Sequence, residues 1–490
     1  MIDIKVVKNS AVYTACNFMT KALNFLLLPL YAAFLTTGDY GITGIMDSFK
    51  GVMCYLAIFS VQAAVMRFYI DYKSSAECLA RYNGTLFFFS FLSTVGWSLL
   101  ICILNPILMP LLFSGIDFAP TLIIALVGLA FGNVVSVYQQ LLIGMEEAFL
   151  SALIAIGNVL LTAVLTIIAI VPLGLGANGV LLASTIDSVV FFAIAVVHLR
   201  RKGMLAFCID LRILRDVLRY SIPLLPHNLS TSIASLVSTI LINGTGSLSA
   251  VGLYSLASKF GVVCDVLQSS VSNAYQPWLF RMLNEKKSDY KQQIASFTEA
   301  MLWIFAAVFV AVGLFIQDII ILALPEDYVA AWPLVPLIVV VYSIKTVYYF
   351  YVNILFYYKE AARYIFVATL SSSILNVALS FPLIAFMGAY GSVLADGVSM
   401  LLRVGLVIWM SRKYDDAGYR VWRFARTTLS IIFVLAAGLF FSYTQFLYEF
   451  SAFNFLWKVA VYLVFILLIC RVNKGSVALV RKRIRSRFSN

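Results

Sequence analysis

Long apolar runs alternate with short polar segments along almost the whole chain. A helix needs about 20 apolar residues to cross a lipid bilayer, and the runs reach that length. Several runs contain proline, so we expect tilted or kinked helices. The pattern predicts an all-α integral membrane protein with about fourteen transmembrane helices, at residues 10–35, 42–66, 84–113, 120–143, 149–171, 178–198, 221–242, 251–280, 296–323, 332–357, 364–385, 391–410, 425–446 and 453–470.

The composition supports this interpretation. Hydrophobic residues make up 62% of the 490 residues and charged residues 12%, and the mean hydropathy is +0.96. A soluble chain is closer to one quarter charged, because its surface faces water. These values exclude a soluble enzyme, a secreted disulfide scaffold and a receptor with a single anchor.

The basic residues predict the orientation. The loops after even-numbered spans, together with both termini, hold 29 of the 35 lysines and arginines, whereas the loops after odd-numbered spans hold none. Basic loops remain on the cytoplasmic side of a membrane. We therefore expect both termini in the cytoplasm and a multi-pass protein of the bacterial inner membrane. The same distribution assigns the net charge of +12 to the membrane face and argues against nucleic acid as a partner.

The two halves of the chain resemble each other at a nearly constant offset, which is the mark of an internal repeat. Three pairs of segments, each at the same span boundary, lie 211 to 213 residues apart: GANGVLLA at 176–183 with GAYGSVLA at 388–395, YGITGIMDSFKGV at 40–52 with VGLYSLASKFGVV at 251–263 (Gly41 over Gly252), and LLIGMEEA at 141–148 with ILFYYKEA at 354–361.

This offset corresponds to six spans, an even number, so both halves have the same orientation. A pseudo-twofold axis along the membrane normal is then expected, with a central cavity of the kind that transporters use. The predicted domains are an N-terminal lobe at 1–199, a basic cytoplasmic linker at 200–220, a C-terminal lobe at 221–411, two further spans at 412–472 and a basic cytoplasmic tail at 473–490.

Four phrases resemble the bacterial polysaccharide flippases, the O-antigen and capsule repeat-unit exporters of the multidrug/oligosaccharidyl-lipid/polysaccharide superfamily. They are LLLPLYAAFLTTGDYGI at 26–42, AAVMRFYIDY at 63–72, LRYSIPLLPHNLS at 218–230 and VGLYSLASKF at 251–260. The resemblance implies alternating access and a substrate of oligosaccharide linked to undecaprenyl diphosphate, which passes to the outer leaflet for surface polysaccharide synthesis. One departure is ASLVSTI at 234–240, where relatives often carry an acid-base dipeptide.

Basic residues inside the spans are the candidate substrate site, because a charge at mid-bilayer is costly and has to face protein or water. The resemblance implies that spans 1, 2, 7 and 8 line the cavity, which places Lys21, Lys50 and Lys259 there. Arg67, at the end of the second span, is a fourth candidate. A cationic cavity would offset the cost of moving a diphosphate, with roughly two negative charges, away from the interface.

Simpler structural roles remain open for these residues. Lys50 is three residues after Asp47 on the same helix face and could pair with it, Lys21 could extend to the inner interface, and Arg67 could be an ordinary interface arginine. For two other charges a structural role is the first expectation. Asp396 and Arg403, two turns apart, are expected to form a bridge, and Lys458 beside Trp457 is expected to anchor the outer interface.

Energy coupling has two candidates, His227 and Asp187, because histidine titrates near neutral pH and an acid held in a membrane can bind a proton. A proton or sodium gradient is the expected driving force, and no cofactor or metal is expected, since the seven cysteines have no metal-ligand spacing. The chain contains no GxxxxGKS/T phosphate loop, HExxH pair or GxSxG elbow. Without these motifs, we do not expect an enzyme.

The sequence therefore favours a flippase for lipid-linked repeat units, with membrane lipids and a polysaccharide polymerase complex as expected partners. Two alternatives remain: a multidrug/cation antiporter of the same superfamily, and a flippase for the peptidoglycan precursor lipid II. An antiporter would favour a cavity rich in acids and commonly has twelve spans. A membrane glycosyltransferase or ligase is disfavoured because every predicted outer loop is short. The glycan and the pathway (O-antigen, capsule or exopolysaccharide) stay open.

Overall fold

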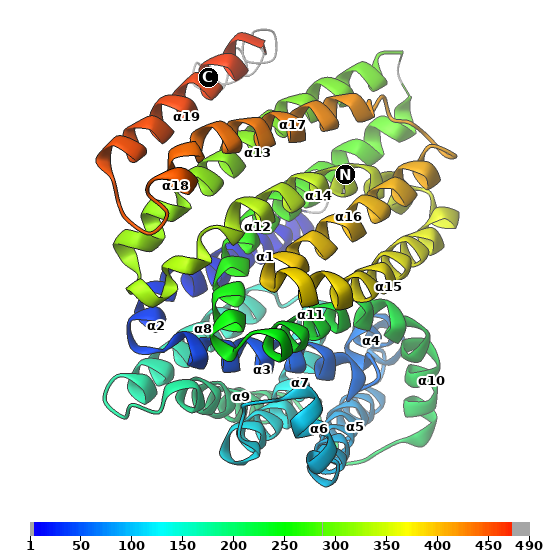
Figure 1. Cartoon of the computed structure of the whole chain (residues 1–490). Helices are drawn as coiled ribbons and strands as arrows, with labels where there is room; N and C mark the ends of the chain where they lie inside the picture. The colour runs from blue at the N-terminus through cyan, green and yellow to red at the C-terminus, as the bar shows by residue number, and fades with distance from the viewer. Residues whose placement is uncertain (1–3, 287, 473–490) are drawn as a thin grey trace. The chain divides into compact units, whose positions relative to one another are not determined.

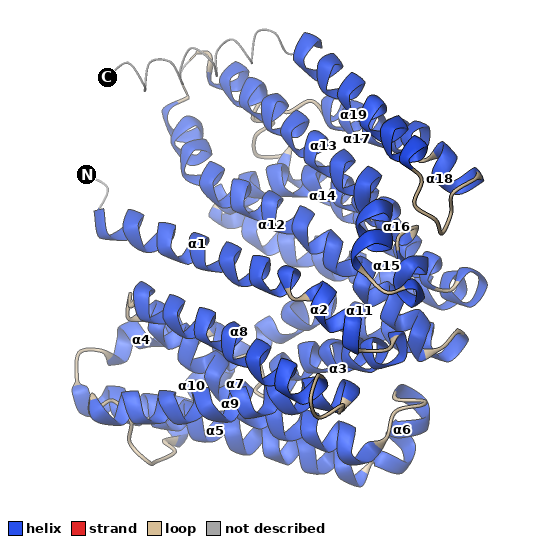
Figure 2. Ribbon diagram, turned by 90° about the vertical axis from the view of Figure 1, so that its left-hand side faces the viewer, coloured by secondary structure: helices blue, strands red, loops and turns tan. Residues whose placement is uncertain are grey.

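The computed structural model describes residues 4–286 and 288–472, and every regular element in that part of the chain is helical (Figures 1 and 2). The predicted basic tail at 473–490 lies outside the described residues. Two compact units divide the chain, one ending at Ser255 and the other beginning at Leu256. The division falls inside one long helix, α12, and the lobe boundaries expected from the repeat stay a prediction.

The first unit contains the predicted spans 1 to 7 and the first two turns of α12. Its helices are α1 (Ile4–Leu26), α2 (Leu28–Phe34), α3 (Thr37–Leu56), η1 (Val61–Ala63), α4 (Val65–Tyr72), α5 (Ala76–Ile103), α6 (Asn105–Leu112), η2 (Phe118–Leu122), α7 (Ile123–Gly144), α8 (Ala148–Ile170), α9 (Gly176–Arg201), α10 (Leu211–Ser221), η3 (Ile222–Leu224) and α11 (Leu225–Thr245).

The second unit contains most of α12 and the predicted spans 9 to 14. Its helices are α12 (Leu248–Glu285), α13 (Tyr290–Ala323), η4 (Glu326–Ala331), α14 (Leu334–Tyr357), η5 (Lys359–Ala361), α15 (Ala362–Met387), α16 (Ala389–Ser411), α17 (Val421–Gly438), α18 (Phe440–Thr444) and α19 (Ala452–Val472).

The predicted class is confirmed: the chain is an all-α, multi-pass membrane protein. Among the described residues, twelve helical segments are long and apolar enough to cross a membrane. The other two predicted spans coincide with α1, of 23 residues, and α3, of 20 residues. Both helices carry a lysine, Lys21 or Lys50, together with other polar residues, and this lowers their hydropathy.

Each unit is built around one central helix. In the first unit α7 packs against α9, α5 and α4, and its Val134 and Leu142 have no exposed surface. In the second unit α14 packs against α16, α13 and α17, with Val335 and Val339 fully buried. Both helices are predominantly apolar, which is the composition expected of a helix that is packed on most of its sides.

The second predicted span is broken between α3 and α4. Phe59 and Ser60 both have positive φ angles, 51° and 56°, and these values end the regular helix. Side-chain hydroxyls bind carbonyls on both sides of the break: the Ser93 hydroxyl donates to the Ala57 carbonyl at 2.6 Å and the Tyr82 hydroxyl to the Val65 carbonyl, in the first turn of α4, at 2.9 Å. Irregular backbone at membrane depth is tolerated only when it is buried and bonded in this way.

Prolines mark most of the other interruptions, as predicted. Pro29 lies at the start of α2, where the first span is interrupted at Leu27, and Pro106 lies in the first turn of α6. Pro223 lies in the short η3 turn that precedes α11. Pro110 and Pro382 lie inside α6 and α15. A proline at the beginning of a helix costs little because its missing N–H would have no partner there.

The first turns of α3 and α12 cross at two glycines. A Cβ atom on Gly41 would overlap the Leu248 carbonyl oxygen, and a Cβ atom on Gly252 would overlap the Thr37 carbonyl oxygen. Only glycine allows two helix backbones to approach this closely. These are the glycines that the repeat places over each other, 211 residues apart. The repeat therefore brings equivalent residues into direct contact.

Candidate functional site

Lys21 lies in the last two turns of α1, near the middle of the predicted first span at 10–35, and is exposed. Within the described residues its ammonium group makes no ion pair or hydrogen bond. Asn17 and Asn24, one turn before and one turn after Lys21, are exposed as well, whereas Cys16 is buried and directed at the Ala152 carbonyl of α8. One face of α1 therefore packs on α8, and another presents a polar strip that contains a basic residue within a membrane span.

Lys50 is held inside the first unit. Its Nζ atom donates to the Ser184 hydroxyl of α9 at 3.0 Å, and Ser184 in turn donates to the Leu181 carbonyl. The half-buried ammonium group therefore has one neutral partner across the helix pair, while Asp47 in the preceding turn is exposed. Asp47 also acts on this ammonium group electrostatically, and the three N–H donors of a lysine leave capacity for a further anion.

Asp187 is a buried acid on the same helix, α9, with 3% of its surface exposed. The Asn158 side chain of α8 donates to Asp187 Oδ2 at 2.6 Å. Its other carboxylate oxygen, Oδ1, has no hydrogen-bond partner among the described residues. This geometry places a single acid between two packed helices, three residues from the Ser184 that holds Lys50.

The second unit contains a similar arrangement. Asn376 of α15 donates to Asp396 Oδ1 of α16 at 2.7 Å, so in each unit an asparagine holds an aspartate on the following helix. The sequence carries a signal for this pair, since NVLLT begins at Asn158 and NVALS begins at Asn376. Sequence reasoning found the two acids and missed the two asparagines.

The expected direct bridge between Asp396 and Arg403 is not formed. Arg403 Nε instead donates to the Ser372 hydroxyl of α15 at 2.7 Å, while Asp396 is held by Asn376 of the same helix. Both charges therefore bind α15, which packs along α16. The prediction considered only spacing along one helix, and it missed that the neighbouring helix supplies closer partners.

Lys259 belongs to the second unit and is exposed on α12. Two turns further along this helix, Asp265 forms an ion pair with Lys345 of α14 at 2.6 Å. The Tyr349 hydroxyl donates to the same carboxylate oxygen at 3.0 Å, and the Lys345 ammonium lies 5.1 Å from the centre of the Tyr342 ring. The pair is about three-quarters buried. The sequence suggested no role for Lys345, because its partner is 80 residues away.

Lys458 is not the outer-interface anchor that the sequence suggested. Its side chain has no exposed surface, and its Nζ atom pairs with Asp318 Oδ2 of α13 at 2.7 Å. A second bond runs to Gln317 Oε1 at 2.7 Å, and Asn454 donates to that oxygen too. The ion pair thus joins α19 to α13, because burial of a charge requires a partner of opposite sign.

The other two candidates lie near the ends of spans. Arg67 forms a two-oxygen contact with Asp71, one turn later on α4, at 2.9 and 2.8 Å, and more than half of its side chain is exposed. His227 lies in the first turn of α11, beside Pro226, and its carbonyl accepts from Ser230. Arg67 is therefore paired within its own helix.

Ion pairs hold the loop between α16 and α17, which is on the predicted cytoplasmic side. Lys291 pairs with Asp416 at 2.7 Å, and Lys286 lies 3.6 Å from Asp415. The Lys291 ammonium holds the pKa of Asp416 below its usual range. These pairs fix the loop between α16 and α17 against the start of α13.

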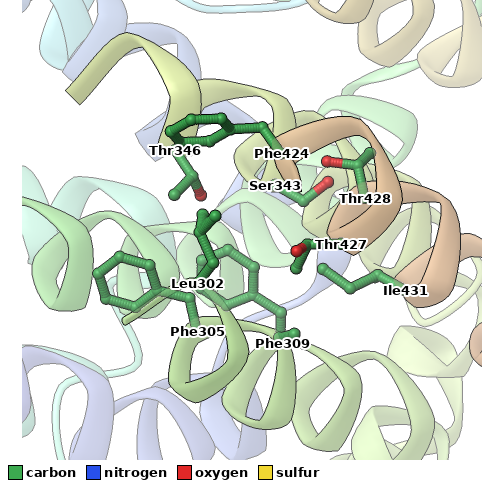
Figure 3. A pocket seen from close by; sticks show the side chains of 10 residues that line it. Leu302, Phe305, Phe309, Ser343, Thr346, Phe424, Thr427, Thr428 and Ile431 are labelled. Carbon is green, nitrogen blue, oxygen red and sulfur yellow. The ribbon is translucent and has the colours of Figure 1, made fainter. Parts of the chain in front are cut away.

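A small pocket lies between α13, α14 and α17 of the second unit (Figure 3). Phenyl rings and hydroxyl groups line it, but three of the hydroxyls already bond to carbonyls one turn earlier in their own helices: Ser343, Thr346 and Thr427. No charged side chain lines the pocket. It therefore contributes nothing to an anion site.

Several solved structures of known transporters have a similar fold. The chain resembles the solved structure of the lipid II flippase MurJ in its inward closed conformation, with a TM-score of 0.69 and 16% identity over 94% of this chain and 99% of that one. An inward-facing multidrug resistance transporter of the MATE family and MOP superfamily gives a TM-score of 0.61 and 15% identity, covering 84% and 96%. The MATE transporter VcmN of Vibrio cholerae, in its bent form, gives 0.53 and 15%, covering 86% and 99%.

At these identities the structural likeness concerns the fold, and the family comes from the sequence. No curated relative matches the chain. The family described as polysaccharide biosynthesis protein matches residues 6–283, which is more than half of the 490 residues. The chain therefore belongs to the polysaccharide biosynthesis protein family and has the fold of the multidrug/oligosaccharidyl-lipid/polysaccharide exporters.

Proposed function

We propose that this protein is a flippase that moves oligosaccharide repeat units, linked to undecaprenyl diphosphate, across the bacterial inner membrane by alternating access. The product serves surface polysaccharide synthesis, as O-antigen, capsule or exopolysaccharide. The observation that carries the proposal is the basic character of two helices in a chain of this family: Lys21 is exposed on α1, within the predicted first span, and the Lys50 ammonium group on α3 donates to the neutral Ser184 hydroxyl.

Charge favours this substrate over an organic cation. A diphosphate placed among hydroxyls and amides would lose much of its hydration, and lysine ammonium groups compensate for that loss. Lysine also binds without the fixed two-point geometry of arginine, which suits a substrate that has to be released again. Lys259, exposed on α12, belongs to the same proposal as a residue that meets the diphosphate or an acidic sugar.

The expected location is the inner membrane with both termini in the cytoplasm, and the expected partners are the lipid-linked glycan, membrane lipids and a polysaccharide polymerase complex. We infer a proton or sodium gradient as the driving force and no cofactor. His227 and Asp187 are the residues to substitute first in a test of coupling. Asp187 is the stronger of the two because it is the more deeply buried, with 3% of its surface exposed.

A deletion strain tests the function. Loss of the gene should abolish surface polysaccharide while lipid-linked repeat units accumulate inside the cell, and the wild-type gene should restore export. Lys21→Ala and Lys50→Ala should each reduce export about tenfold or more, because one charge contact to a phosphate contributes roughly 1.5–3 kcal/mol. Lys73→Ala, an exposed lysine after α4, is the matched control and should export normally.

Protein levels in the membrane have to be equal among the variants for this comparison. Normal export by both lysine variants would refute the cationic site. Unchanged polysaccharide in the deletion strain, together with altered drug sensitivity, would favour the antiporter. Accumulation of lipid II and cell lysis instead would favour the peptidoglycan-precursor flippase, the other alternative that shares this fold.

A further inference from the structure

The segment between α9 and α10 forms a fixed surface that the transport function leaves unexplained. Three hydrogen bonds hold it against α5: Ala206 N–H donates to the Ala80 carbonyl at 3.0 Å, the Asn83 side-chain amide to the Met204 carbonyl at 2.9 Å, and Asp210 N–H to the Thr85 hydroxyl at 2.9 Å. The Ala206 carbonyl also lies where a Cβ atom of Gly84 would be. The segment is therefore a docked part of the first unit.

This docked segment exposes apolar side chains in spite of its fixed position. Phe207 is 56% exposed, Ile209 43% and Leu211 74%. They lie within ten residues of Arg201, the end of α9, and shortly after the predicted sixth span at 178–198, which suits the depth of the membrane interface. Apolar side chains that are exposed together on a rigid support indicate a surface that is covered in the cell.

Arginines surround these side chains. Arg212, Arg215 and Arg219 follow each other at spacings of three and four residues on α10, which puts them on one stripe. Ile213 and Val217, buried at 7% and 0% exposure, form the opposite face. The three arginines are exposed and form no ion pair with any residue that the structure describes.

Other residues add to the positive charge of the same surface. The Arg200 guanidinium lies 4.2 Å from the centre of the Phe207 ring, which joins the end of α9 to the exposed apolar group. The segment 200–220 contains six basic residues and two acidic ones. One of these acids, Asp210, is occupied as the N-terminal cap of α10, where its carboxylate accepts from two backbone N–H groups.

We propose that this surface, defined by Phe207, Ile209, Leu211, Arg212, Arg215 and Arg219, is a docking site for anionic phospholipids of the cytoplasmic leaflet. The apolar side chains enter the headgroup region, and the arginines contact lipid phosphates. An apolar face bordered by arginines is the pattern of an element that lies in the membrane plane. Anionic lipid is favoured over a zwitterionic lipid because only it neutralises the net positive charge of the stripe.

Cys208 provides the probe, since it lies between Phe207 and Ile209 and is half-buried. The full-length chain, with its other cysteines replaced by serine, carries a fluorescent label on Cys208 and is reconstituted in phosphatidylcholine vesicles. Equal mole fractions of brominated phosphatidylglycerol or brominated phosphatidylcholine then quench the label. The quenching ratio of the two lipids measures the enrichment of anionic lipid beside the segment.

The expected ratio favours phosphatidylglycerol by about tenfold, and it decreases when salt is added. Arg212→Gln, Arg215→Gln and Arg219→Gln together should reduce it to about one, because the stripe then attracts neither lipid preferentially. The matched control replaces three other exposed basic residues of predicted cytoplasmic loops, Lys73, Arg81 and Arg420, and should keep the ratio.

A wild-type ratio near one would overturn the proposal. It is also the result expected if a soluble protein, and not lipid, covers this surface in the cell. An equal loss of preference in the control variant would overturn it as well, since the net charge and not this surface would then select the lipid. The result does not depend on export. A chain that fails as a flippase can still select anionic lipid, so the two proposals fail independently.

Discussion

The most deeply buried charge in the described part of the chain is Lys458. Its ammonium group, Asp318, Gln317 and Asn454 form one network between α13 and α19. The Gln317 amide also donates to the Phe446 carbonyl, in the segment that leads into α19. A lysine with no exposed surface and an acid with 5% are costly to separate, because each would then be an unpaired charge in an apolar setting.

Lys458→Met is therefore expected to lower the free energy of unfolding by about 3–5 kcal/mol, since it leaves Asp318 buried and unpaired. The double variant Lys458→Met/Asp318→Leu should recover most of this loss, because neither charge remains. Thermal unfolding in detergent measures both variants.

Another ion pair of the chain supplies the control for that measurement. Lys202 pairs with Glu147 at 2.5 Å, but 40% and 29% of the two side chains are exposed. Lys202→Met should cost less than about 1 kcal/mol. Equal destabilisation by Lys458→Met and Lys202→Met would mean that burial of the Lys458–Asp318 pair does not increase its effect on stability.

The hydrogen-bond and ion-pair partners of individual residues were the part of the structure that the sequence predicted least. It identified Lys21, Lys50 and Asp187 as unusual, because a charge inside an apolar run is visible in the sequence. It could not supply Ser184 for Lys50 or Asp318 for Lys458, since those partners are 134 and 140 residues away. Pairing at such distances depends on packing, which leaves no local pattern.

At the scale of the elements, the apolar runs predicted the helices, but the sequence predicted only some of the interruptions within them. Pro29, Pro106 and Pro223 predicted interruptions that the structure contains. The break at Phe59 and Ser60 has no proline or glycine within it. Hydroxyl groups of another helix, those of Ser93 and Tyr82 on α5, bind carbonyls on either side of it. The second span was therefore predicted as one helix, and it is two.

The crossing of α3 and α12 provides a test at this scale. Gly41→Ala should prevent the close approach, because its Cβ atom would overlap the Leu248 carbonyl oxygen. We expect the free energy of unfolding to fall by about 3 kcal/mol or more, or the protein to fail to accumulate in the membrane. Overpacking of an interior typically costs about 1–3 kcal/mol, and here the overlap is with backbone, which cannot move aside easily. Gly252→Ala should behave in the same way.

Gly51→Ala in the same helix is the matched control. A Cβ atom on Gly51 would meet nothing within 4 Å, so alanine should be neutral or should stabilise α3 by up to about 1 kcal/mol. Comparable yields and melting temperatures for Gly41→Ala and Gly51→Ala would refute a tight crossing. The measurement is thermal unfolding of purified protein together with its level in isolated membranes.

At the scale of the whole molecule, the prediction concerns orientation. A chain with all cysteines but Cys78 replaced should react with a membrane-impermeant maleimide only in inside-out vesicles, because exposed Cys78 lies in a loop predicted to be cytoplasmic. Leu173→Cys in the same background should react only in right-side-out vesicles, since it is 61% exposed in the loop after span 5. Labelling of both residues from one side would refute the alternation of loops.

The glycine crossing also bears on how a chain of this kind can originate. Residue 41 meets residue 248, and residue 252 meets residue 37, so the contact is isologous, like the interface of a twofold homodimer. Such an interface can exist before two half-length genes are fused, because one glycine supplies both sides. After fusion the copies can diverge elsewhere: Asp39 now corresponds to Ala250, and Gly44 to Ser255. Where the two backbones touch, neither copy can change without blocking the other.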